Sequence, residues 1–187
     1  MMKNKYPKEF KVYKDRIRLV AFIVILAILY VMFKVVFETN YVPSGSMEPT
    51  LMTNDMVMVE RYKSNMEIKR GDIVTFRYPD NKSELFVKRV IGLPGEQIEI
   101  KKGRVYVNGK LLDESSYLKV TPNSNGDGVY YVPENSYFML GDNRNHSHDS
   151  RFWTNKYVKE DDIEGKPIFR IAPLNTIGSL TQKNIYK

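Results

Sequence analysis

The sequence predicts a mostly β protein that is preceded by a single transmembrane helix. Three observations support this fold class. An unbroken apolar run covers residues 19–33, and short strand-forming segments bounded by turn signals fill residues 38–187. Those later residues show no long amphipathic helix pattern. A length of 187 residues suits one modest domain with an appendage.

The apolar run is long enough to cross a lipid bilayer. It contains no charge up to Phe33, Lys34 interrupts it, and residues 35–37 extend it. A helix over residues 19–37 spans about 28 Å, close to the thickness of the hydrocarbon core. A lysine near its end can reach the interface. We therefore expect a single-pass anchor over residues 19–37.

Basic charge is concentrated before this segment. The net charge is +7, and residues 1–18 carry seven basic side chains against two acidic ones. Residues 38–187 carry 21 basic and 20 acidic side chains, so we expect no nucleic-acid partner. The positive-inside bias predicts a cytoplasmic basic arm at residues 1–18 and an extracytoplasmic domain at residues 38–187 of a cell-membrane protein.

A cleaved signal peptide is the alternative interpretation of this N-terminal region, since it shares the basic start and the apolar centre. However, the apolar stretch is longer than a usual signal-peptide core, and residues 38–43 offer no small-x-small site. An uncleaved anchor is the favoured interpretation, and a mature protein that begins after Phe37 would contradict it.

Several strand signals follow the anchor. Strand-like segments occupy residues 56–59, 72–77 and 85–91. The dipeptide Asn108-Gly109 between two apolar segments is a strong type I′ hairpin signal. Residues 115–131 are rich in Asn, Gly, Ser and Pro, and we expect a loop there.

The residue types present limit the chemistry of the chain. It has no cysteine, which excludes a disulfide framework, a thiol nucleophile and a cysteine-based metal site. A metal site built from His146 and His148 with Asp142 or Asp149 lacks a specific spacing motif. A Ser-His-Asp triad is also weakly supported, because Asp149 is too close in sequence to orient His148. We expect neither a metal nor another cofactor.

A candidate nucleophile lies in residues 43–51, where two serines flank Gly45 between two prolines. A serine on such a stiffened loop can attack a carbonyl while a nearby backbone N–H stabilises the oxyanion. Taken alone, this motif fits a plain turn after the membrane segment better.

Lysine is the other base that the sequence offers. Lys88 lies in a predicted strand with Phe86 and Val90 on its own face. Burial among apolar neighbours lowers the pKa of a lysine, whereas Arg89 keeps its proton in any environment. From this segment alone, a lysine that extends to solvent is the simpler interpretation.

A third motif covers residues 141–151 and is dense in polar hydrogen-bonding groups between two apolar segments. It fits a surface loop, or a set of Asp–Arg pairs that support a site.

Taken together, these motifs resemble those of the type I signal peptidases. Residues 44–51 look like the family's nucleophile box, residues 71–76 like a structural strand, residues 88–96 like its lysine box, and residues 141–151 like its last box. Four motifs in this order behind an apolar segment are far more specific than any one of them. The short chain is similar to the compact single-anchor members typical of Gram-positive bacteria.

The resemblance implies a serine endopeptidase that removes signal peptides from secretory preproteins after A-x-A-like sites. Ser46 would be the nucleophile, and Lys88 would be the general base. The Ser46 backbone N–H and the Ser44 hydroxyl would form the oxyanion hole, and Ser147 would orient Lys88. The remaining implied residues are the supporting groups Asp142, Arg144, Asp149 and Arg151 and the substrate-pocket residues Val42, Met47, Leu51, Phe86 and Met139.

The resemblance also implies a coiled antiparallel β-sheet domain with a hairpin insertion at about residues 97–133. The implied partners are preproteins and membrane lipid. His146 stands where the family often has asparagine and Glu96 where it often has aspartate, and His146 could add a pH dependence near neutrality. A membrane-anchored β domain that binds peptide or cell-wall ligand, and an inactive scaffold relative, stay open as alternatives. Neither alternative gives Ser46 and Lys88 a chemical role.

Overall fold

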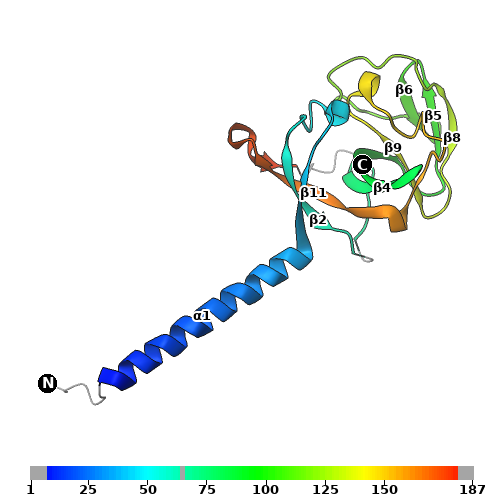
Figure 1. The fold of residues 1–187 in the computed structure, drawn as a ribbon. Helices are drawn as coiled ribbons and strands as arrows, with labels where there is room; N and C mark the ends of the chain where they lie inside the picture. The colour runs from blue at the N-terminus through cyan, green and yellow to red at the C-terminus, as the bar shows by residue number, and fades with distance from the viewer. Residues whose placement is uncertain (1–7, 64–65, 181–187) are drawn as a thin grey trace. The chain divides into compact units, whose positions relative to one another are not determined.

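The computed structural model describes residues 8–63 and 66–180, and it divides the chain into two compact units, residues 1–37 and 38–187. The first unit contains helix α1 (Lys8–Val36), drawn in blue in Figure 1. Among the described residues one helix, over Val12–Val36, is long and apolar enough to cross a membrane. Helix α1 therefore begins within the basic arm, ahead of the predicted segment 19–37, and ends one residue before Phe37.

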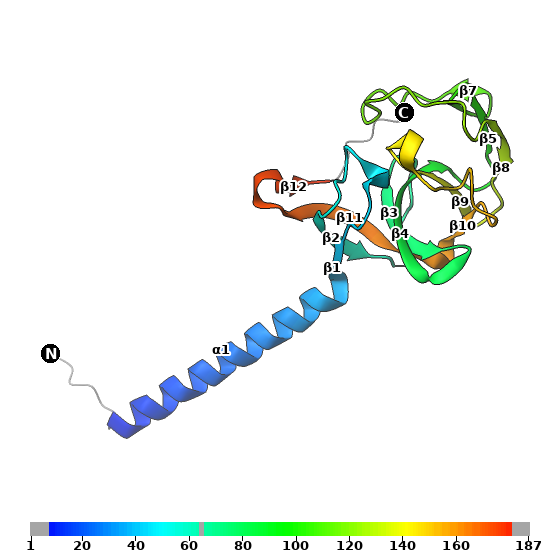
Figure 2. The ribbon, with the colours of Figure 1, turned by 45° about the horizontal axis from the view of Figure 1, so that its top comes forward.

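The larger sheet of the second unit has eight strands in the order β1-β2-β11-β3-β4-β9-β10, with β12 paired to β11. Each described register is antiparallel. Strand β11 lies between β2 and β3, although it comes late in the chain (Figure 2). The strand bounds are β1 Phe37–Tyr41, β2 Met56–Arg61, β3 Ile73–Tyr78, β4 Asn81–Gly92, β9 Ser136–Leu140, β10 Val158–Lys159, β11 Ile163–Ala172 and β12 Gly178–Ser179.

A smaller antiparallel sheet has the order β7-β6-β5-β8, with bounds β5 Gln97–Lys101, β6 Arg104–Val107, β7 Lys110–Leu111 and β8 Gly128–Tyr131. Asn108 and Gly109 join β6 to β7 with positive φ angles of 49° and 78°, which is the predicted type I′ geometry. The predicted loop 115–131 ends earlier, because its last four residues form β8 and bury Tyr130. The predicted mostly β, antiparallel fold class is confirmed.

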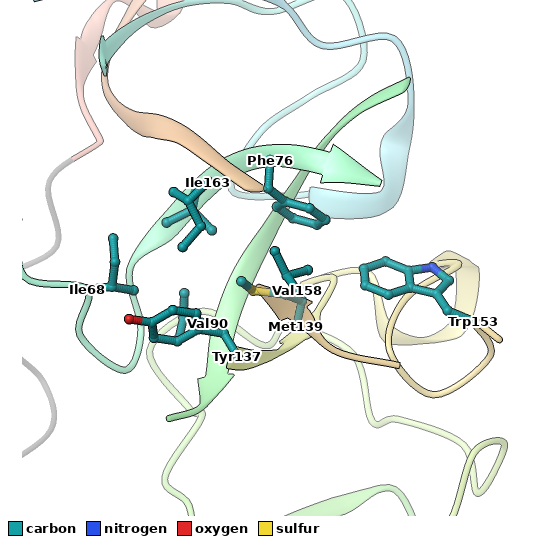
Figure 3. Packing of buried hydrophobic residues seen from close by; sticks show 9 residues of the cluster. Ile68, Phe76, Val90, Tyr137, Met139, Trp153, Val158 and Ile163 are labelled. Carbon is teal, nitrogen blue, oxygen red and sulfur yellow. The ribbon is translucent and has the colours of Figure 1, made fainter. Parts of the chain in front are cut away.

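Strand β9 and residues 88–92 of β4 are buried on both faces, whereas residues 81–85 of β4 are exposed. Val90 and Met139 belong to one hydrophobic cluster, shown in Figure 3. Phe138 and Leu140 belong to a second cluster that includes side chains of the smaller sheet. Neighbouring residues of a strand face opposite sides, so burial on two sides explains the unbroken apolar run at residues 137–140.

A third cluster fastens the loop that follows β1 to the sheet. We call residues 43–51 the serine loop. Its Met47 and Leu51 pack with Val57 of β2 and Ile73 of β3, and both are fully buried. Burial of such side chains stabilises the fold by about 2 kcal/mol each. The serine loop is therefore held in place over β2 and β3.

Candidate active site

A serine hydroxyl and a buried lysine amine meet where the serine loop reaches β4. Lys88 Nζ donates a hydrogen bond to Ser46 Oγ at 2.6 Å. Ser46 lies in the short 3-10 helix η1 (Gly45–Met47), and Lys88 lies in β4. The two residues are 7% and 4% exposed. The structure thus brings the predicted nucleophile and the predicted base into contact.

The surroundings of Lys88 favour its neutral form. Burial lowers the pKa of Lys88 from 10.5 to about 8, while the nearby carboxylates of Asp149 and Asp142 act in the opposite direction. The ring of Phe86 lies 5.3 Å from Nζ on the same side of the strand. With a pKa of about 8, about a tenth of the lysine is neutral at pH 7. Lys88 can therefore accept a proton under ordinary conditions.

The Ser46–Lys88 pair opens into a groove of about 440 Å³. Residues 40–46 and residues 85–88 supply most of the lining, and Asn143, His146 and His148 complete it with Val57 and Thr75. Of the predicted substrate-pocket residues, Val42 and Phe86 line this groove.

The other three predicted substrate-pocket residues lie in the core. Met47 and Leu51 belong to the cluster beneath the serine loop, and Met139 belongs to the cluster of Figure 3. Each is 0% exposed. None of the three lines the groove, and in this structure they pack in the core next to it.

The two further serines of the prediction differ in their surroundings. Ser44 is exposed, lines the groove and lies with its Oγ 3.4 Å from Ser46 Oγ. Ser147 Oγ is buried and forms no hydrogen bond with any described residue, so the expected bond to Lys88 is not formed. A Cβ atom on Gly141 would lie 2.2 Å from Ser147 Oγ and 2.4 Å from the Ser46 carbonyl oxygen. Ser147 thus packs against Gly141, beside the backbone of Ser46.

Two buried ion pairs lie next to the Ser46–Lys88 pair. Arg89 binds Asp142 through two hydrogen bonds of 2.8 and 2.6 Å, and both side chains are fully buried. Arg151 binds Asp149 in the same way, at 2.7 and 2.9 Å. Such bidentate pairs fix the geometry of both partners. Asp142 also accepts a hydrogen bond from Thr50 of the serine loop at 2.5 Å.

The other predicted arginine, Arg144, pairs with Glu114 and donates from Nε to the Gly141 carbonyl at 3.1 Å. Glu114 lies outside all the predicted site motifs. Arg89 lies in the predicted lysine motif, but no ion pair was predicted for it. The polar motif contains two arginines and two aspartates, so its composition does not indicate that either arginine takes a carboxylate from outside the motif. The pairing follows only once the structure shows Asp142 bound to Arg89, because a buried guanidinium requires a carboxylate.

Asn143 was also missed, although it lies inside the predicted polar motif. Its Nδ2 donates to the Gly45 carbonyl at 3.0 Å, and its backbone N–H donates to the Ser46 carbonyl at 3.1 Å. Asn143 therefore ties the polar loop, residues 141–151, to Ser46, the predicted nucleophile.

Both histidines have other partners. His148 Nε2 lies 3.1 Å from the Tyr78 hydroxyl, and His146 Nδ1 lies 3.3 Å from Asn143 Oδ1. The hydroxyl of Ser46 is hydrogen-bonded to Lys88 and not to either histidine. Within the described parts of the chain, no group of three or more His, Cys, Asp or Glu side chains could hold a metal ion.

A serine hydroxyl that is hydrogen-bonded to a buried amine beside a groove is an arrangement typical of serine hydrolases. Residues 16–172 match the family described as signal peptidase, peptidase S26. The chain belongs to this family and is a serine peptidase.

The chain is also similar to individual signal peptidases. A probable signal peptidase I-2 from Synechocystis sp. is 42% identical over 150 residues, which cover 77% of this chain and 67% of the relative. A probable signal peptidase I-1 from the same organism is 35% identical over 188 residues, which cover 96% of this chain and 93% of the relative. A crystal structure of a signal peptidase I from Enterococcus faecalis is 36% identical, with a TM-score of 0.45, over 55% of this chain and 98% of that chain.

Proposed function

We propose that the chain is a membrane-bound endopeptidase that removes N-terminal signal peptides from secreted preproteins, with Ser46 as nucleophile and Lys88 as general base. The hydrogen bond of 2.6 Å between Lys88 Nζ and Ser46 Oγ is the observation that carries this proposal. The groove beside the pair and the family of the chain support it.

In the proposed reaction, neutral Lys88 takes the proton of Ser46 Oγ as this oxygen attacks the scissile carbonyl carbon. The backbone N–H of Ser46 and the hydroxyl of Ser44 stabilise the resulting oxyanion. When the carbon–nitrogen bond breaks, the Lys88 ammonium returns the proton to the leaving amine. Water then attacks the acyl ester, Lys88 takes its proton, and the proton passes to Ser46 Oγ as the signal peptide leaves.

An extended preprotein segment fits the groove as an added strand. Residues 85–88 of β4 pair with β3 on one side, whereas the described pairing of β4 with β9 begins at Arg89. The opposite edge of residues 85–88 therefore faces the groove. Val42 and Phe86 give the groove an apolar wall close to Ser46, which suits small side chains before the scissile bond, as in A-x-A-like sites.

We infer the membrane orientation from charge. The basic side chains of residues 1–18 precede the apolar part of α1, and Lys34 is the one charged residue near its end. The positive-inside bias then places the N-terminus in the cytoplasm and residues 38–187 outside. The groove would lie on the side of the membrane where exported preproteins emerge.

A cleavage assay tests this proposal. The purified full-length chain, in detergent or lipid vesicles, is incubated with a preprotein that bears an Ala-x-Ala site, and the products are identified by mass. We expect one cut after the second alanine. Ser46→Ala and Lys88→Met should each lower the rate by about 10³-fold or more. Lys82→Met and Ser83→Ala, which alter exposed residues of the same strand, are matched controls and should cleave normally.

Two outcomes would contradict parts of the proposal. Cleavage that survives in Lys88→Met would keep the enzyme but assign the base to another residue. A folded wild-type protein that cleaves none of several preproteins would favour a binding or scaffold role.

A further inference from the structure

The loop between β7 and β8 buries two of its side chains against the polar loop. We call residues 112–127 the bracing loop. Glu114 is 8% exposed and Tyr117 is 2% exposed, while its other residues are exposed or half-buried. A carboxylate is seldom buried unless it is paired with a positive charge. The partner of Glu114 is therefore the informative contact.

Glu114 binds Arg144 of the polar loop through both carboxylate oxygens. Oε2 accepts from Nη1 at 3.1 Å, and Oε1 accepts from Nη2. The two side chains are 7% and 3% exposed. Arg144 in turn donates from Nε to the carbonyl of Gly141, which directly precedes Asp142. Glu114 thus fixes a guanidinium that holds the start of the polar loop.

Tyr117 extends this contact to the strand of the general base. Its hydroxyl donates to Glu114 Oε1 at 2.5 Å, and Cζ of Arg89 lies 4.1 Å from the centre of its ring. A guanidinium over an aromatic face is attracted to the ring. Arg89 directly follows Lys88 and binds Asp142. The ring of Tyr117 therefore covers the ion pair next to the proposed base.

The second half of the bracing loop meets the same polar loop. The Asn123 N–H donates to Asn145 Oδ1 at 2.9 Å, and Asn145 Nδ2 donates to the Thr121 carbonyl at 3.3 Å. Arg151, the partner of Asp149, donates from Nη1 to the carbonyl of Asn125 at 3.4 Å. All three arginines of the site thus contact the bracing loop.

We propose that the bracing loop is a positioning element of the active site, and that Glu114 is its principal positioning residue, acting through Arg144. This inference rests on the proposed Ser46 and Lys88 mechanism. Glu114 is the one carboxylate of the three buried arginine pairs that comes from outside the polar loop. The bracing loop therefore supplies the carboxylate that neutralises Arg144, although it contributes no catalytic residue to the site.

The charges around Lys88 determine the effect of removing Glu114. The carboxylates of Asp149 and Asp142 favour the Lys88 ammonium. The other charged or titratable groups of the site are Arg89, Arg144, Arg151, His146 and His148. Without Glu114, the cation of Arg144 is uncompensated, and it disfavours the ammonium of Lys88. At an effective dielectric constant of about 20, an uncompensated unit charge in the neighbourhood of the base moves the midpoint of its titration down by about one pH unit.

The pH profile of the full-length enzyme tests this positioning role. We expect kcat/KM of the wild type on an Ala-x-Ala peptide to rise with pH around a midpoint of about 8. Glu114→Gln should move this midpoint down by about one pH unit. Glu114→Ala also loses the hydrogen bonds that hold Arg144, so its plateau kcat should fall about tenfold with little change in KM.

Glu96→Gln is the matched control, because it removes the carboxylate of another Arg–Glu pair, with Arg70, away from the groove. It should lower the melting temperature without moving the midpoint. A midpoint and plateau kcat in both Glu114 variants equal to those of the wild type would overturn the inference. If neither variant folds, Tyr117→Leu replaces them, and a wild-type kcat in that variant would overturn it equally.

The same experiment separates this inference from the proposed function. A wild type without activity, or activity that survives in Ser46→Ala and Lys88→Met, overturns the proposed function and with it the positioning role. Activity that requires Ser46 and Lys88 but is the same in the Glu114 and Tyr117 variants as in the wild type overturns the positioning role alone.

Discussion

At the scale of single residues, Lys88 combines reactivity with a cost in stability. Burial lowers its pKa from 10.5 to about 8. Between these pH values the unfolded chain binds one proton more than the folded chain, so the free energy of unfolding increases as the pH rises. Below about pH 8, burial of the ammonium destabilises the fold by about 3 kcal/mol.

This destabilisation predicts that the inactive variant Lys88→Met is more stable than the wild type. At pH 7, Lys88→Met should raise the free energy of unfolding by about 3 kcal/mol, because it removes the buried ammonium. The difference should shrink toward zero as the pH approaches 10.5. Denaturant titrations at several pH values measure it, with Lys82→Met as the exposed control. A less stable Lys88→Met at pH 7 would mean that the bond to Ser46 outweighs the desolvation.

At the scale of elements, the serine loop is held from two directions. Met47 and Leu51 anchor it to the core, and Asn143 binds the carbonyls of Gly45 and Ser46. Asn143→Ala should lower kcat about tenfold through misplacement of the nucleophile. KM should change less than kcat, because residues 40–46 and 85–88, which form most of the groove, are unchanged although Asn143 also lines it. Steady-state kinetics on a short peptide measure both constants, and a rise in KM alone would contradict the tethering role.

The elements also show what the sequence can predict. The type I′ turn at Asn108-Gly109 depends on two neighbouring residues, so its signal is local and its prediction is confirmed. The place of β11 between β2 and β3 depends on pairing across distant segments. The same limit holds for the site. Motif resemblance identified Ser46 and Lys88, whereas the Arg89–Asp142 pair joins positions 53 residues apart, which no periodicity within one element specifies.

At the scale of the whole molecule, the two units of the chain have different proposed roles, membrane attachment and catalysis. Over residues 12–36, where its side chains are described, helix α1 has no buried side chain, and it is apolar enough to cross a membrane, which fits a role in attachment. The second unit, residues 38–187, contains the groove and all three hydrophobic clusters. Anchoring an enzyme in the membrane that holds its substrate raises their effective concentration without any new contact.

Deletion of residues 1–36 tests this division and leaves β1 intact. On a short soluble peptide, we expect kcat/KM of the truncated chain to stay within about threefold of the full-length value, since its groove is unchanged. On a preprotein embedded in vesicles, it should fall about 100-fold, because the encounter is no longer confined to the membrane. Equal losses on both substrates would show that α1 supports the fold of the catalytic unit. An undiminished rate on the vesicles would show that the catalytic unit finds its substrate without the anchor.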